Sequence, residues 1–150
     1  MTQSLRLAVY VRTPVAEATA SRQSALISRA ESLHRRGLAD GVSVDFWHRL
    51  ETGMDPAAAE RLAAMERWAE SRGCSLAPAF DRRDRHSAYV GDDTVVTLPV
   101  VCLVAEADGD IVGVYPHVGP CGSCSVADGL DRIEAAVLAG EPLGYTGSQR

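Results

Sequence analysis

The chain has 150 residues, 46% of them hydrophobic and 23% charged, which predicts one folded domain with an apolar core and excludes a disordered chain. Its formal net charge of -5 excludes a nucleic-acid surface that covers the whole molecule, because binding to phosphates depends on clustered positive charge. No apolar run reaches the roughly 20 residues of a membrane helix, and residues 1–4 lack the pattern of a signal peptide, so we expect a cytoplasmic protein without membrane contact.

The first part of the chain predicts a β-α-β unit. Residues 5–12 alternate and then become continuously apolar, which is typical of a strand near the middle of a sheet. Thr13 and Pro14 are suited to begin a helix, and Gly37 is suited to end it. The apolar alternation over residues 42–50 indicates a second strand, which would pair in parallel with the first across the helix.

A second helix and a charged segment follow. Asp55 can cap a helix that has Pro56 at its first position and ends at Gly73. Residues 74–80 are a candidate for a short extended segment, and residues 81–86 are so strongly charged that we expect a loop there.

The last part of the chain predicts a hairpin and a closing helix. Residues 95–105 and 111–117 flank an acidic, Gly-containing turn, as in an antiparallel hairpin with a largely buried first arm. Ser125 and Asp128 match a capping box, so the last helix is expected to begin there.

The elements follow the order β-α-β-α-(β)-β-β-α and predict a single α/β domain, with a core over 5–139 and a flexible tail over 140–150. This order, with a mixed sheet flanked by helices, resembles the thioredoxin-like fold, most clearly over residues 95–138. In that fold the proline ahead of the buried strand is usually cis, and Pro99 is the matching residue. The fold's Cys pair would lie at residues 12–15, where this chain has no cysteine. The resemblance therefore implies the scaffold and not its dithiol mechanism.

Cys121 and Cys124 are the only close pair among the four cysteines. Two thiols at this spacing can close a small disulfide or supply half of a zinc site. If the last helix begins near Ser125, the positive end of its dipole would favour the thiolate form of both. Three states stay open from the sequence: ordinary reduced thiols, a reversible disulfide that senses redox conditions, and a metal site.

His117 extends the pair to three candidate zinc ligands. A zinc site usually has four ligands, and the fourth would be Cys74, Cys102, an acidic side chain or a residue of a partner. The alternative for His117 is a partly exposed residue at the end of a strand.

Arginines form two dense positive groups. Arg82, Arg83 and Arg85 lie in the charged segment, and Arg35 and Arg36 lie on the first predicted helix. Guanidinium groups suit phosphate and carboxylate recognition, so the first group is a candidate basic patch for nucleic acid or an acidic partner. The alternative is a solvated loop, because aspartates dilute its charge.

A second resemblance covers nearly the whole chain and rests on four segments, residues 7–12, 44–47, 68–69 and 98–103. Together they resemble a family of small proteins from halophilic archaea that is labelled as helix-turn-helix domain proteins. The label implies DNA binding or transcriptional regulation.

These observations lead to one main hypothesis and two alternatives. The main hypothesis is a non-enzymatic regulatory or binding domain in which Cys121 and Cys124 act as a redox switch or a partial zinc site, with His117 as the third ligand. The first alternative is the DNA-associated transcriptional regulator that the family resemblance implies. The second is a thiol-disulfide oxidoreductase. A protein partner or a homodimer is expected in each case.

Overall fold

A four-stranded sheet of order β2-β1-β6-β7 forms the centre of the computed structural model, which describes residues 4–141 except 48, 52–55, 88–90 and 121. Strand β1 pairs in parallel with β2 and antiparallel with β6, and β6 pairs antiparallel with β7. The predicted β-α-β unit and the hairpin after it are therefore confirmed. The four strands are β1 (Leu5–Arg12), β2 (Gly41–Trp47), β6 (Val101–Ala107) and β7 (Asp110–Tyr115).

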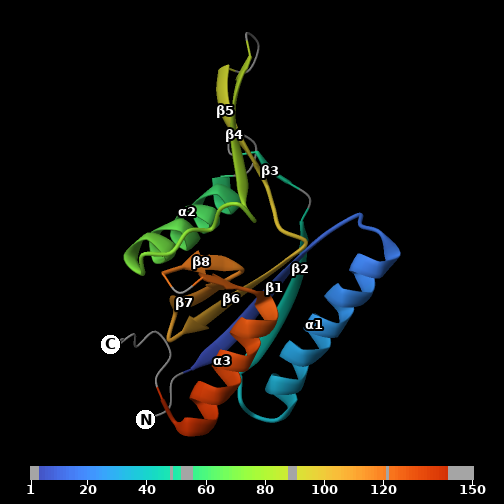
Figure 1. Cartoon of the computed structure of the whole chain (residues 1–150), viewed down its shortest axis with the longest axis vertical. Coiled ribbons are helices and arrows are strands. Elements are labelled where there is room, and N and C mark those ends of the chain that lie inside the picture. The colour runs from blue at the N-terminus through green and yellow to red at the C-terminus, as the bar shows by residue number, and fades with distance from the viewer. Residues whose placement is uncertain (1–3, 48, 52–55, 88–90, 121, 142–150) are drawn as a thin grey trace.

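Three helices cover the two faces of this sheet. Helices α1 (Glu17–Arg35) and α3 (Val126–Ala139) lie together on one face, and α2 (Pro56–Ser71) covers the other (Figure 1). Alternate residues of β1 pack against the helices on opposite faces, because successive side chains in a strand point to opposite sides of the sheet. The α/β class and the predicted flanking of the sheet by helices are thus observed.

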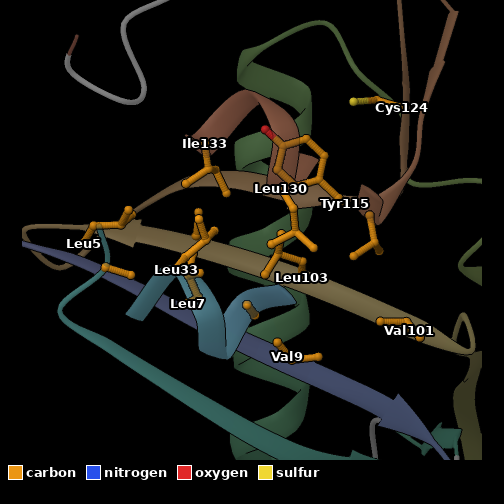
Figure 2. Close-up of a cluster of buried hydrophobic side chains, with 14 of the residues drawn as sticks. Leu5, Leu7, Val9, Leu33, Val101, Leu103, Tyr115, Cys124, Leu130 and Ile133 are labelled. Atoms are coloured by element: carbon orange, nitrogen blue, oxygen red, sulfur yellow. The ribbon is translucent and has the colours of Figure 1, made fainter. Parts of the chain in front are cut away.

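The α1/α3 side holds the larger core. Figure 2 shows Leu7 of β1, Leu33 of α1, Leu103 of β6 and Leu130 of α3 gathered between the sheet and the helices. The α2 side has its own buried cluster, to which the helix contributes a stripe at helical spacing: Leu62, Met65 and Ala69.

Helix α1 begins at Glu17 and not at Thr13 and Pro14 as the sequence predicts. The backbone N–H groups of Arg12 and Thr13 donate to Val100 and Trp47, each at 3.0 Å, so the sheet pairing extends past the predicted start of the helix. The predicted capping box of α3 is confirmed, with Ser125 and Asp128 bonded to each other's backbone N–H.

A second sheet forms an arm that projects from the body (Figure 1). Its order is β3-β5-β4, and its strands are β3 (Arg49–Glu51), β4 (Asp81–Ser87) and β5 (Gly91–Thr97). The prediction of a loop over residues 81–86 is therefore wrong. Strand β4 pairs with β5 along its whole length, and in this projecting hairpin the side chains at 81–83 stay exposed to water, so their charge does not oppose strand formation.

The same pairing divides the predicted hairpin arm at residues 95–105. Its first residues belong to β5 in the second sheet, and the central sheet begins again at Val101. Three cis peptide bonds are found in the described residues, before Pro14, Pro78 and Pro116. The bond before Pro99 is not among them, which corrects the prediction of a cis proline there.

A short ribbon completes the fold beside β7. It consists of β8 (His117–Gly119) and β9 (Gly122–Cys124), and Ser75 joins it through a bridge to Val118. No helix in the described part of the chain is long and apolar enough to cross a membrane. The predicted tail after residue 139 falls almost wholly outside the described residues.

Candidate functional site

The predicted thiol pair is only half visible, because Cys121 lies outside the described residues. Cys124 ends β9, is 3% exposed and is a free thiol. Figure 2 shows it at the margin of the core, beyond Tyr115. Burial raises the pKa of Cys124, Asp128 and Cys74 raise it further, and the guanidinium of Arg132 opposes them. Burial thus outweighs the positive charge near Cys124, and the effect of the helix dipole on its thiolate stays a prediction.

His117 lies directly opposite Cys124 in the β8-β9 ribbon. Its ring contacts the rings of Trp68 and Tyr115, with centroid distances of 5.4 and 5.1 Å. It is only 8% exposed, so the alternative of a partly exposed residue at a strand end is wrong. Its Nδ1 lies 2.7 Å from the carbonyl oxygen of Val114, which can only accept, so neutral His117 carries its proton on Nδ1 and keeps a lone pair on Nε2.

Cys74 approaches the same face of the ribbon from a distant part of the chain. Gly119 and His117 lie two residues apart on one strand and therefore face the same way. A Cβ built on Gly119 would lie 3.5 Å from Sγ of Cys74 and 3.9 Å from Cδ2 of His117. Burial also raises the pKa of Cys74, opposed by Arg72 and Arg132. Of the two cysteines proposed as a fourth ligand, Cys74 is therefore the one beside this ribbon.

Cys102 lies elsewhere, fully buried in β6 on the α2 side of the central sheet, where burial strongly raises its pKa. Within the described residues, no three His, Cys, Asp or Glu side chains are arranged to hold a metal ion. Cys74, His117 and Cys124 are neighbours without being a preformed site. The redox switch and the zinc site remain predictions.

The candidate basic patch lies on β4. The guanidinium of Arg82 pairs with Glu66 of α2, and Nε of Arg83 lies 3.1 Å from Asp81. Arg83 has a side chain that is 79% exposed. Arg85 lies opposite Asp93 in the β4-β5 register, and its side chain is outside the described part. Strand formation thus brings each arginine of the patch close to a carboxylate or opposite an acidic residue.

A groove that the sequence did not predict lies at the base of the arm, next to α2. It has a volume of about 580 Å³ and runs between the end of α2 and the segment 74–82. Three carboxylates and one guanidinium line it together with buried apolar side chains. No motif marks these residues, because they become neighbours only when β4 pairs with β5 and folds against α2.

No two helices follow one another in the described part of the chain, since strands separate α1 from α2 and α2 from α3. The two close helices of a helix-turn-helix motif are therefore absent from it. A family model described as "Helix-turn-helix domain" nevertheless matches residues 1–137. No curated protein matches the chain, and no solved structure matches it.

Proposed function

The chain belongs to this helix-turn-helix domain family, and from that membership we propose that it acts as a DNA-associated regulator. The family match over residues 1–137 is the observation that carries the proposal, because it covers every described helix and strand except the last two residues of α3. The thioredoxin-like scaffold, which no solved structure supports by similarity, stays a prediction.

We assign the contact with DNA to the projecting arm. A two-stranded β-ribbon fits the major groove, and several DNA-binding proteins use strands in this way. Strands β4 and β5 form such a ribbon and extend away from the body (Figure 1). The exposed side chains of Arg82 and Arg83 supply guanidinium groups for phosphate oxygens.

The charge of the arm limits the strength of this contact. Strands β4 and β5 contain three arginines and four aspartates. The Asp81–Arg83 pair is exposed to solvent, and such pairs contribute little, so a phosphate can replace Asp81. With at most three phosphates neutralised, the logarithm of affinity should fall with the logarithm of salt concentration with a slope of about -2.7. We expect a homodimer, which presents two arms, to raise the affinity.

Fluorescence anisotropy with a labelled 30-base-pair duplex, measured over a series of salt concentrations, tests the proposal. Arg83→Ala should weaken binding and reduce the salt slope by about 1. Arg22→Ala, an exposed arginine on α1, is the matched control and should change neither. Absence of binding at low salt would refute the regulator, whereas equal slopes for both variants would refute only the role of the arm.

A further inference from the structure

The groove at the base of the arm combines an apolar floor with an acidic rim. Its floor consists of four buried side chains, Ala69, Leu76, Phe80 and Val96. They come from α2, the segment after it and β5. A groove of about 580 Å³ lies within the range of small-molecule sites, which are roughly 300–1,000 Å³. The contact with DNA proposed above shares only Arg82, at the rim, with this groove.

The rim of the groove carries an excess of negative charge. Glu66, Glu70 and Asp81 line it, against a single guanidinium, that of Arg82. Glu66 is engaged by Arg82, and Asp81 by Arg83, which is outside the groove. Glu70 is exposed and forms no ion pair with any other described residue. One carboxylate is thus free to receive a cation beside an apolar surface.

We propose that this groove binds a small organic cation with an apolar body. Burial of the apolar body against Leu76 and Phe80 supplies the favourable free energy, and its charge pairs with Glu70. An anion of similar size is repelled by the rim, and an inorganic or short alkyl cation gains nothing from the floor. The combination of the two surfaces therefore selects one chemical class of ligand.

Ligand binding here also reaches the arm, a consequence that rests on the proposed function. A cation at Glu70 lies one turn of α2 from Glu66, so it also attracts that carboxylate and competes with Arg82 of β4. The released guanidinium becomes available for a phosphate, so the ligand should tighten DNA binding. The groove would then be the effector site of the regulator.

Thioflavin T, an apolar organic cation whose emission rises on immobilisation, is a suitable probe for the 150-residue chain without DNA. We expect saturable binding that an excess of tetramethylammonium does not displace. The apolar anion 8-anilinonaphthalene-1-sulfonate should not compete for the site. Competition by this anion, or no thioflavin T binding, would overturn the proposal.

Two charge reversals on the same helix make the test specific. Glu70→Arg should weaken thioflavin T binding about fivefold or more, and Glu70→Gln about two- to fivefold, as expected for a partly exposed charge pair. Glu60→Arg makes the same change in net charge outside the groove and should leave binding unchanged. Equal affinities for the Glu70→Arg and Glu60→Arg variants would overturn the assignment.

DNA affinity with and without thioflavin T separates this proposal from the proposed function. A tighter complex in the presence of the probe supports the link through Arg82. Specific binding of the probe by a protein that binds no DNA would refute the regulator and leave the cation site standing. An unchanged DNA affinity would overturn the link alone.

Discussion

Gly129 lies where helix α3 touches the ring of Tyr115, and replacing it by alanine tests how closely the last helix packs on the sheet. A Cβ at this position would lie 2.5, 2.6 and 2.7 Å from Cγ, Cδ2 and Cδ1 of Tyr115. Ordinary contacts between carbon atoms are about 3.5–4.0 Å. Tyr115 is itself buried, so either the ring or the helix has to move.

Two opposing terms determine the size of the effect. Overpacking of a core costs about 1–3 kcal/mol. Alanine is favoured over glycine within a helix by about 1 kcal/mol. We therefore expect Gly129→Ala to lower the free energy of unfolding by about 1 kcal/mol. For a chain of this length, the midpoint of thermal unfolding should fall by about 2–4 °C.

Urea unfolding followed by circular dichroism measures the change. Ala135→Gly, at an exposed position of the same helix, gives the helix-propensity term for this protein and should cost about 1 kcal/mol. In a Tyr115→Ala background the ring is gone, so Gly129→Ala should become stabilising. If Gly129→Ala stabilises the otherwise unchanged protein, the close contact between α3 and the ring is refuted.

Three further predictions concern the cap, a buried amide and the thiols. Ser125→Ala should lower the free energy of unfolding by about 1 kcal/mol. The Ser125 backbone N–H and hydroxyl also lower the pKa of Asp128. The stabilising effect of that carboxylate should therefore be lost as pH falls through the lowered pKa, which urea titrations at several pH values would detect. The buried amide of Gln23 donates two hydrogen bonds to backbone carbonyls, at 2.7 and 2.9 Å. Gln23→Leu removes both and should lower the free energy of unfolding, measured by thermal unfolding, by about 1–3 kcal/mol. An unchanged free energy would contradict these two hydrogen bonds. Native thiol labelling followed by mass spectrometry should modify half-buried Cys74 before fully buried Cys102. The labelling rate at Cys74 should rise with pH, because burial raises the pKa of this thiol and keeps it protonated near neutrality. Faster labelling of Cys102 would contradict the placement of β6.

The elements of the central body could be predicted from local patterns. Strand β1, helix α2 and the capping box at Ser125 each depend on a few neighbouring residues, and all three are observed. The parallel pairing of β1 and β2 also followed, because a helix between two strands allows few other arrangements.

The start of α1 and the path of the arm could not be predicted in this way. Thr13 and Pro14 favour a helix start locally. The backbone N–H of Thr13 instead donates to Trp47 of β2, which holds this residue against the sheet. The charged residues 81–87 carry no apolar pattern, and they form a strand because β5 supplies partners for their backbone.

The candidate sites show the same division. From the sequence alone came the identity of the thiols, the histidine and the arginines, together with the central α/β order and the cap of the last helix, because these depend on residue chemistry and local periodicity. Only the tertiary structure decided that Cys74 approaches His117 and Cys124, that burial raises the pKa of both described thiols beside the ribbon, and that an acidic, apolar groove forms under the arm. Each of these depends on contacts between residues far apart in the chain, whose pairing and burial no local pattern specifies.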